Sequence, residues 1–240
     1  MQSNKVIVVI PVYKAQPDKD EAMALRQALK ILRRHPILLV YPDKLPLDAY
    51  FDIGFTRQQA TPYRSDLFKD ISAYNKWLCS KHFYTDFSNY DFVLIFQSDA
   101  WVFRDDLIEW CDKDYDYIGS PWLWKPEQVR NKVKIDLWPL LRNQVGNGGV
   151  SLRKTSTMMK YAGLATFLFR LLKKNEDFIW LLVSRLPWVK MKKPLPTEAL
   201  QFCIEMNPDK ALDLLNNKLP FSTHAYIRYG REFWKKHIPI

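Results

Sequence analysis

The segment Lys5–Tyr13, KVIVVIPVY, decides the fold class. Its apolar run is continuous and rich in β-branched residues, which is typical of a strand buried on both faces of a parallel sheet. Residues 18–34 follow with apolar residues at helical spacing, an acidic start and a basic end, which predicts a helix whose charges complement its dipole. A second apolar run, Ile37–Tyr41, completes a β-α-β unit. We therefore expect an α/β protein with a central, mostly parallel sheet flanked by helices.

The rest of the chain continues this alternation of apolar runs and amphipathic segments. Residues 43–61 and 122–144 lack periodicity, so we expect loops there, and the second is long enough to be a candidate lid. No repeat or linker interrupts the chain, which favours one domain over residues 1–240. The further predicted strands are 91–96, 115–119, 150–153 and one near 219–226, and the further predicted helices are 65–79, 105–111, 155–174, 176–185, 197–206 and 207–215.

Positive charge is concentrated in one part of the chain. The 240 residues have a net charge of +10, and residues 121–193 alone carry 15 basic and 4 acidic side chains, a net +11. Such a block fits an anionic membrane surface, a phosphate-bearing substrate or nucleic acid, although a solvated basic face is an open alternative. No recognisable nucleic-acid-binding motif supports the nucleic-acid reading, so we expect no such partner.

Two further patterns concern the cellular setting. Cys79, Cys111 and Cys203 are widely spaced, which argues against a disulfide framework and for a reducing compartment. The sequence has no signal-peptide pattern and no apolar run long enough to span a bilayer. Residues 164–174 and 180–185 are basic and amphipathic, a pattern that favours anionic lipid surfaces, unless they pack as core helices. We expect a cytoplasmic protein, with a peripheral position at the inner face of the cytoplasmic membrane left open.

Three unusual segments fall at the ends of predicted strands, where α/β sheets bind their ligands. They are Pro11-Val12-Tyr13, Gln97-Ser98-Asp99-Ala100 and Gly146–Gly149. A carboxylate at a buried strand end is costly unless it is paired or binds a metal, so Asp99 is a candidate site residue, with a capping role as the alternative. Neither a GxGxxG nor a GxxxxGK[ST] motif is present, which argues against dinucleotide binding and P-loop chemistry.

The ordered set of motifs resembles the GT-A class of nucleotide-sugar-dependent glycosyltransferases, and more closely an uncharacterised, bacterial-type family within it. The matching pieces span nearly the whole chain. They are VIVVIPVY at 6–13, ISAYN at 71–75, YDFVLIFQSDAWVF at 90–103, YDYIGSPW at 115–122, GNGGVSLR at 146–153, Glu176-Asp177 and LPFSTHAY at 219–226. The resemblance implies a GT-A-like fold, with residues 1–120 as the nucleotide-sugar-binding half and residues 121–240 as the acceptor-binding half.

The resemblance also implies a divalent metal, Mn or Mg, that bridges the donor diphosphate. In GT-A enzymes an Asp-x-Asp motif holds this ion, and the matching tripeptide here is Gln97-Ser98-Asp99, in which the first Asp is replaced. Asp99 and the late His224 are the expected metal ligands, and the replacement of the first Asp by Gln97 is expected to weaken metal binding. The residues that the resemblance places around the nucleotide sugar are Pro11, Val12, Tyr13, Tyr74, Asn75, Gln97, Ser98 and Asp99.

The acidic pair Glu176-Asp177 stands where inverting GT-A enzymes keep a catalytic base. By this resemblance Asp177, or Glu176 in second place, would take the proton of the acceptor hydroxyl. The alternative is a pair of carboxylates that stabilises a helix N-terminus. The residues expected to contact the sugar or acceptor are Trp122, Asn147, Gly148, Gly149 and Arg153. For the glycines, a hairpin turn is the alternative.

Together these patterns predict an enzyme that moves a sugar from a nucleotide-sugar donor to a hydroxyl of a saccharide or lipid-linked glycan. The acidic pair favours inversion, and cell-surface polysaccharide or lipopolysaccharide biosynthesis is the expected setting. Two other readings stay open: a catalytically inactive glycan- or membrane-binding protein of the same fold, and a basic nucleic-acid-binding module.

Overall fold

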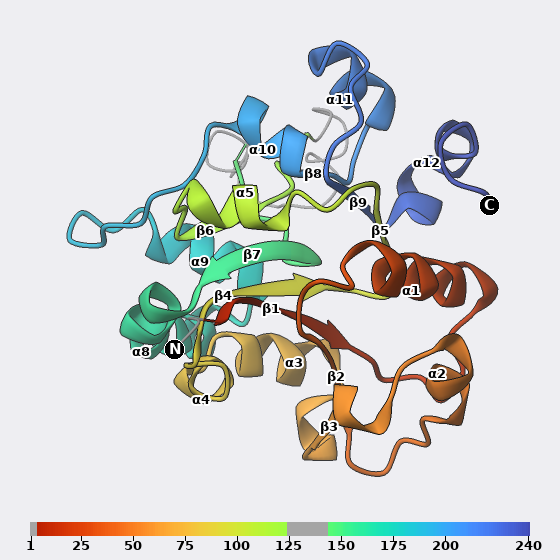
Figure 1. Cartoon of the computed structure of the whole chain (residues 1–240). Coiled ribbons are helices and arrows are strands. Elements are labelled where there is room, and N and C mark those ends of the chain that lie inside the picture. The colour runs from red at the N-terminus through yellow and green to blue at the C-terminus, as the bar shows by residue number, and fades with distance from the viewer. Residues whose placement is uncertain (1–3, 124–143) are drawn as a thin grey trace.

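The computed structural model describes residues 4–123 and 144–240, and within them the central sheet has the expected parallel core. Six strands lie in the order β3-β2-β1-β4-β7-β6 (Figure 1). The parallel strands are β1 (Asn4–Pro11), β2 (Ile37–Pro42), β3 (Ala60–Tyr63) and β4 (Tyr90–Phe96). β7 (Val150–Lys154) runs antiparallel to its neighbours β4 and β6 (Tyr117–Gly119). One sheet thus takes strands from both sequence halves.

The central strand β1 is buried on both faces, as its sequence predicts. Val6, Val8 and Ile10 belong to one apolar cluster, whereas Ile7 and Val9 belong to another. Because successive side chains of a strand point to opposite faces, the two clusters lie on opposite sides of the sheet. The first is covered by α1 (Lys19–Ile31), α2 (Asp48–Ile53), α5 (Leu107–Asp112) and α10 (Pro196–Phe202); the second by α3 (Ile71–Leu78), α4 (Lys81–Thr85), α8 (Thr155–Leu172) and α9 (Glu176–Val183).

A second, smaller sheet extends one end of the structure. β9 (Ser222–His224) pairs antiparallel with β5 (Ala100–Val102) and parallel with β8 (Cys203–Ile204). α11 (Pro208–Leu214) and α12 (Tyr226–Trp234) complete this region, packed around Trp101 and Trp234. β5 follows β4 after a three-residue turn, so the small sheet carries its own side chains to the carboxyl end of β4.

Three expectations about secondary structure are wrong in part. The segment 43–61 contains α2, the 3-10 turn η1 (Arg57–Gln59) and the start of β3, rather than only a loop. The helix expected over 65–79 is divided into the 3-10 turn η2 (Ser65–Leu67) and α3, because the Asp70 carboxylate accepts a hydrogen bond from Ala73 N and begins a new helix. The helix expected over 197–206 ends at Phe202, since the next residues pair with β9. Most of the loop expected over 122–144 lies outside the described residues.

Candidate functional site

A cleft of about 820 Å³ lies at the carboxyl ends of β1 and β4. The helices α3 and α9 and the last strand β9 also contribute to its wall, so segments far apart in the sequence meet there. The sequence-predicted site residues that line it are Pro11, Tyr13, Tyr74, Asn75, Gln97, Ser98, Asp99, Asn147, Gly148, Gly149, Glu176, Asp177 and His224. Their proximity follows from the sheet order, because parallel strands end at the same edge.

The tripeptide Gln97-Ser98-Asp99 forms the turn between β4 and β5. The backbone N–H of Gln97 donates to Gly149 O at 3.0 Å. Within the turn, the backbone N–H of Ala100 donates to Gln97 O at 3.0 Å. Ser98 Oγ donates to Glu21 Oε1 at 3.0 Å, which ties the turn to α1. The Asp99 side chain is 46% exposed and faces the cleft, so a ligand can reach it.

His224 joins this turn from the end of β9, where it is paired in register with Ala100. Its Nε2 lies 3.1 Å from Gln97 Oε1 and 3.3 Å from Asp99 Oδ1, while Nδ1 lies 3.2 Å from Glu205 Oε1. Burial lowers the pKa of His224, but the hydrogen bonds to Asp99 and Glu205 outweigh burial and raise it to about 10. Burial likewise raises the pKa of Asp99, yet its contact with His224 outweighs this and holds the pKa below its ordinary value.

This arrangement fits the divalent metal that the resemblance implies. Gln97 Oε1 and Asp99 Oδ1 both lie within 3.3 Å of His224 Nε2, and Glu205 contacts the other ring nitrogen of His224. A metal-ligating histidine commonly has such a carboxylate partner. Among the described residues no group of three or more His, Cys, Asp and Glu forms a metal site, so waters and donor phosphates would complete the shell. Glu205 has no sequence motif of its own; its signal is a carboxylate at the end of the short strand β8.

The two neighbouring acids at the start of α9 have different surroundings. Glu176 is 4% exposed, and its Oε1 accepts a hydrogen bond from Arg153 Nη2 at 2.8 Å. Its backbone N–H donates to Asn75 Oδ1 at 3.3 Å. The second carboxylate oxygen, Oε2, is buried without a hydrogen-bond partner among the described residues. Glu176 therefore carries a charge that Arg153 neutralises, together with one oxygen left without a partner.

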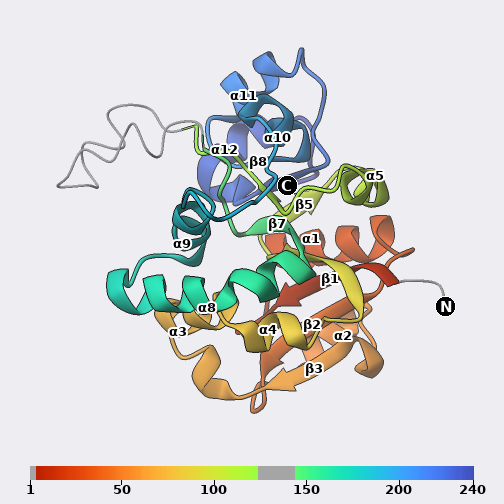
Figure 2. The ribbon, with the colours of Figure 1, turned by 90° about the vertical axis from the view of Figure 1, so that its left-hand side faces the viewer.

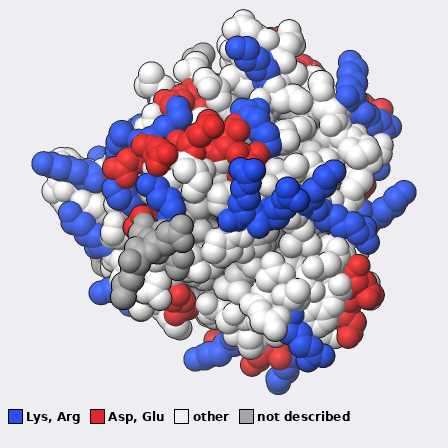
Figure 3. Space-filling view, viewed as in Figure 1, with Lys and Arg blue, Asp and Glu red and all other residues white. Residues whose placement is uncertain are grey.

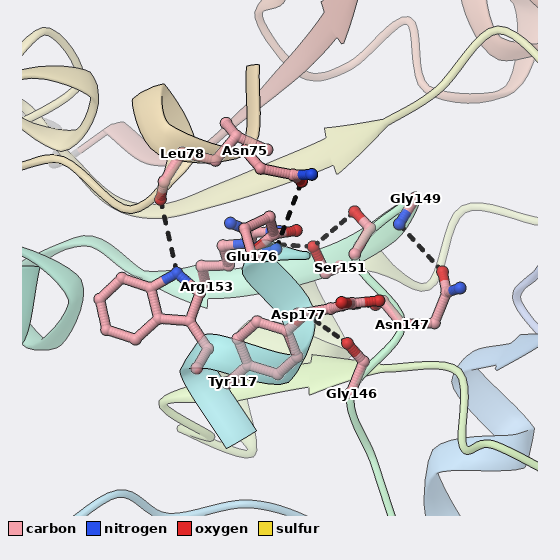
Figure 4. Close-up of polar contacts among 12 residues, drawn as sticks. Asn75, Leu78, Tyr117, Gly146, Asn147, Gly149, Ser151, Arg153, Glu176 and Asp177 are labelled. Atoms are coloured by element: carbon pink, nitrogen blue, oxygen red, sulfur yellow. Dashed lines mark hydrogen bonds and ion pairs between the residues drawn. The ribbon is translucent and has the colours of Figure 1, made fainter. Parts of the chain in front are cut away.

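Asp177 extends away from Arg153 toward Asn147 in the close-up of the site (Figure 4). Its Oδ1 accepts a hydrogen bond from Phe178 N at 2.7 Å. Burial and the adjacent Glu176 charge raise the pKa of Asp177 to about 8. A half-buried carboxyl group at a cleft with a pKa near neutral can both accept and return a proton under ordinary conditions.

Tyr74 and Asn75 come from the first turns of α3. The Tyr74 side chain lines the cleft, but its hydroxyl has no hydrogen-bond partner among the described residues. Burial raises the pKa of Tyr74, so this hydroxyl keeps its proton and remains a donor. Buried polar groups without a partner are uncommon in native proteins, and this one lies behind the wall of the cleft, which makes it a candidate for a ligand contact.

The cations of the cleft do not come from the basic block. Lys14, Lys69 and Arg228 line it, whereas none of the basic residues in the described part of 121–193 does. Lys14 is held by Glu21 at 2.8 Å, and Arg228 is exposed. Figure 3 shows Lys and Arg along α1 as well, and a group of Asp and Glu over α5. The positively charged side chains that line the cleft thus come from outside residues 121–193.

Three predicted contact residues do not reach the cleft. Val12 is 2% exposed, and its backbone N–H donates to Val40 O, so it belongs to the core. Trp122 is 5% exposed and packs against Leu181, which leaves no free ring face for a sugar. Arg153 is fully buried and neutralises Glu176. It therefore holds the Glu176 side chain in place rather than contacting an acceptor.

The glycines at 148 and 149 are needed for close packing within the site. A Cβ atom at Gly148 would lie 2.0 Å from Glu176 Oε1, and one at Gly149 would lie 2.2 Å from the His224 ring. Neither has a positive φ, so neither left-handed backbone nor a two-residue hairpin explains them. The hairpin alternative is therefore wrong, and the missing side chains leave room for Glu176 and His224.

Comparison with solved structures identifies the fold. The apo form of the glycosyltransferase GlyE from Streptococcus pneumoniae TIGR4 matches with a TM-score of 0.56 at 14% identity, over 92% of this chain but only 54% of GlyE. A glycosyltransferase involved in glycosylation of the major capsid of PBCV-1 matches with a TM-score of 0.52 at 10% identity, over 98% of this chain and 100% of its own. The galactosyltransferase LgtC, in complex with donor and acceptor sugar analogs, matches with a TM-score of 0.50 at 14% identity. The match covers 91% of this chain and 86% of LgtC.

At these identities the likeness establishes the GT-A glycosyltransferase fold alone, and it confirms the fold that the sequence motifs predict. The chain spans about half the length of GlyE, so GlyE contains a further part with no counterpart here. No curated protein sequence matches the chain. A family model described as a protein of unknown function, DUF5672, matches residues 57–224.

Proposed function

Because the chain belongs to the DUF5672 family of proteins of unknown function and has the GT-A fold, we propose that it transfers a sugar from a nucleotide-sugar donor to a hydroxyl group. The observation that carries this proposal is one cleft that holds both required chemistries. Asp99 and His224 offer a place for the donor diphosphate, and Asp177 offers a base. These three residues come from well-separated parts of the chain, and they line the same cleft.

The donor diphosphate would bind at the end of β4. Asp99, His224 and the Gln97 amide oxygen would hold a Mn or Mg ion. Such an ion, when bound, supplies positive charge to the phosphates and stabilises the leaving nucleoside diphosphate. Lys14 and Arg228 stand on the same cleft and would add further charge. Pro11 and Tyr13, at the end of β1, would border the nucleoside, and the 62% exposed Tyr13 ring is available for stacking.

The transfer step would use Asp177 as the general base. Its carboxylate takes the proton of the acceptor hydroxyl while that oxygen attacks the anomeric carbon. The new carbon–oxygen bond forms as the bond from the anomeric carbon to the diphosphate breaks, and the nucleoside diphosphate leaves with the electron pair. A single displacement of this kind inverts the anomeric centre. The proton then leaves Asp177 for water.

Sugar hydroxyls would bind beside Asp177. The Tyr74 hydroxyl would donate a hydrogen bond, and Glu176 Oε2 would accept one, once sugar binding moves the side chains that bury these two atoms. Asn147 lines the same wall, although its Oδ1 already accepts from Gly149 N at 2.9 Å. We propose a saccharide or lipid-linked glycan as the acceptor, and cell-surface polysaccharide synthesis at the inner face of the cytoplasmic membrane as the setting.

A thermal-shift panel tests donor binding. UDP-, GDP-, CMP- and dTDP-sugars are each added with Mn, Mg or EDTA, because a ligand of the native state raises the Tm. We expect a shift with one nucleotide class that disappears in EDTA and in Asp99→Asn. Asp213→Asn, on the exposed side of α11, is the matched control and should keep the shift. A shift that survives EDTA would remove the metal from the proposal, and no shift with any donor would contradict donor binding.

A second candidate function, glycan or membrane binding without catalysis, is favoured by one observation. Gln97 occupies the first position of the tripeptide, where an Asp would add a second negative ligand. Turnover separates the two functions. Release of nucleoside diphosphate from the donor identified by thermal shift, with the product anomer read by NMR, supports the enzyme. Binding without release supports the inactive protein, and retention at the anomeric carbon contradicts Asp177 as the base.

A further inference from the structure

The outer face of helix α8 carries apolar side chains that nothing in the described structure covers. The inner face of α8 packs into the core through residues such as Met158, Ala165 and Phe169. On the outer face Phe167 is 62% exposed and Leu171 is 68% exposed. Residues four apart lie side by side on a helix, so these two form a continuous apolar ridge. Figure 2 shows α8 along the face turned toward the viewer.

Positive charge surrounds this ridge. Arg170, Lys173 and Lys174 are exposed beside it, and Lys160 lies two turns earlier on the same face. The sequence from Thr155 to Asn175 contains no acidic residue. None of these four cations forms an ion pair with a described residue, in contrast to Lys154, which pairs with Asp114 at 2.8 Å. The charge of this face is therefore free to act on a partner.

The C-terminal end of α8 lies close to the cleft in the chain. α8 ends at Leu172, Lys173 takes a left-handed conformation with φ of 49°, and the chain turns back into α9. The next residues, from Asn175 to Asp177, line the cleft. Ile71, which is 75% exposed, lines the same cleft from α3. Figure 2 shows α3, α9 and the end of α8 gathered at one edge of the molecule. A partner seated on this end of α8 would thus lie close to residues that line the cleft.

We propose that this face of α8, the α8 patch, binds an anionic lipid surface. The patch consists of Phe167, Arg170, Leu171, Leu172, Lys173 and Lys174. An apolar ridge flanked by cations fits such a surface, since the apolar side chains enter the interface while the cations reach the lipid headgroups. No helix of the described chain is both long and apolar enough to cross a bilayer, so the contact is peripheral.

The closeness of the α8 patch to the cleft adds a consequence for the acceptor. Binding through this patch would bring the lipid headgroups near the cleft, which suits an acceptor that is anchored in the membrane by a lipid. This part rests on the proposed glycosyl transfer, whereas lipid binding itself does not. The two are measured separately: vesicle binding needs no donor, and donor binding needs no vesicle.

Flotation of the 240-residue chain with lipid vesicles tests the α8 patch. We expect binding to mixed phosphatidylcholine and phosphatidylglycerol vesicles at an ionic strength of about 0.15 M, weaker binding at higher salt, and little binding to phosphatidylcholine alone. Lys173→Glu with Lys174→Glu should lower the partition of the protein onto vesicles at least tenfold. Removing one lysine charge weakens binding about a few-fold, and reversing its sign weakens binding further. Phe167→Ser with Leu171→Ser should weaken it similarly, because the apolar contribution is lost.

Matched controls separate the patch from general surface properties. Arg33→Glu with Arg34→Glu makes the same charge change in the exposed turn after α1, and Ile108→Ser with Leu195→Ser removes two exposed apolar side chains elsewhere. Both controls should float like the wild type. The proposal is overturned if the wild type does not bind anionic vesicles, or if both α8 variants bind as well as the controls. It is also overturned if the patch variants abolish a dimer seen by light scattering while vesicle binding stays unchanged.

Discussion

The two ends of the central sheet both carry hollows, but their polar groups differ. At the carboxyl end, the cleft has a carboxyl group with a pKa near neutral, Asp177, and two buried polar atoms, on Tyr74 and Glu176, with no hydrogen-bond partner among the described residues. At the amino end, a hollow of about 370 Å³ is lined by charges that are mostly paired, such as Lys154 with Asp114. The Thr155 hydroxyl, which is buried there, likewise has no partner in the described part of the chain.

Paired charges and unpartnered polar groups indicate different things about the two ends of the sheet. Paired surface charges have already satisfied one another, so they contribute little stability and offer little to a ligand. Perturbed or unpartnered groups are costly for the folded protein, and a ligand can offset that cost. Variants at the two ends should therefore separate activity from stability.

The largest effect is expected for Asp177→Asn. Removing a general base lowers kcat by about 10²- to 10⁴-fold, while donor affinity should stay nearly unchanged. Steady-state kinetics with the donor identified by thermal shift would measure both, with Asp213→Asn as the exposed control. Unchanged kcat in Asp177→Asn would show that this carboxyl group is not the base.

The pH dependence sharpens the same assignment. With its pKa at about 8, Asp177 loses its proton as pH rises through 8, so the kcat/KM of the wild type should rise with pH up to that point. The folded state holds this proton more tightly than the unfolded chain, whose aspartate has a pKa near 3.8. The contribution of Asp177 to stability is therefore fully present below pH 3.8 and is lost as pH rises to 8.

Thermal melts test the predicted direction of this pH dependence of stability. The Tm of Asp177→Asn relative to the wild type should increase between about pH 5 and pH 9, because the variant has no buried charge to form. A constant difference in Tm across this range would mean that Asp177 is ionised throughout.

The buried ion pair beneath the cleft should affect stability most. Arg153→Met leaves Glu176 as an uncompensated buried charge, and breaking such a pair costs about 3–5 kcal/mol of unfolding free energy. Denaturant unfolding would measure the loss. The double variant Arg153→Met with Glu176→Gln should recover part of it, and the absence of any recovery would show that Arg153 stabilises the fold by packing instead.

A smaller effect is expected at Tyr74. Because its hydroxyl has no hydrogen-bond partner among residues 4–123 and 144–240, Tyr74→Phe should leave the unfolding free energy within about 0.5 kcal/mol of the wild type. If the hydroxyl binds substrate, kcat/KM should fall about tenfold, the effect of one hydrogen bond. Tyr115→Phe is the control, since Tyr115 hydrogen-bonds Glu198 away from the cleft. Equal kinetics for both variants would remove Tyr74 from substrate binding.

The smallest effect is expected at the amino end of the sheet. Lys154→Ala removes the exposed pair with Asp114, and such pairs contribute about 0–1 kcal/mol. Neither donor binding nor kcat should change. A loss of activity in Lys154→Ala would contradict the assignment of the activity to the carboxyl end alone, and would indicate a functional group in the smaller hollow.

Much of the site could be predicted because it follows the strand order. The turn at Gln97–Asp99 and the tyrosine at 13 lie where parallel strands end, and each strand is visible as an apolar run. Arg153 and Trp122 could not be placed in this way. Whether a polar or aromatic side chain faces a ligand or the core depends on the segment packed against it, here α9 for both.

The sequence by itself determined the α/β class, the buried central strand and the strand ends where the cleft forms, because burial leaves a periodic record within each short segment. Only the tertiary structure decided that Arg153 neutralises Glu176, that Glu205 holds His224, and that Asp177 alone of the acidic pair extends toward Asn147. The physical reason is that these contacts join residues far apart in the chain. Their energy depends on burial and distance, which no local pattern records.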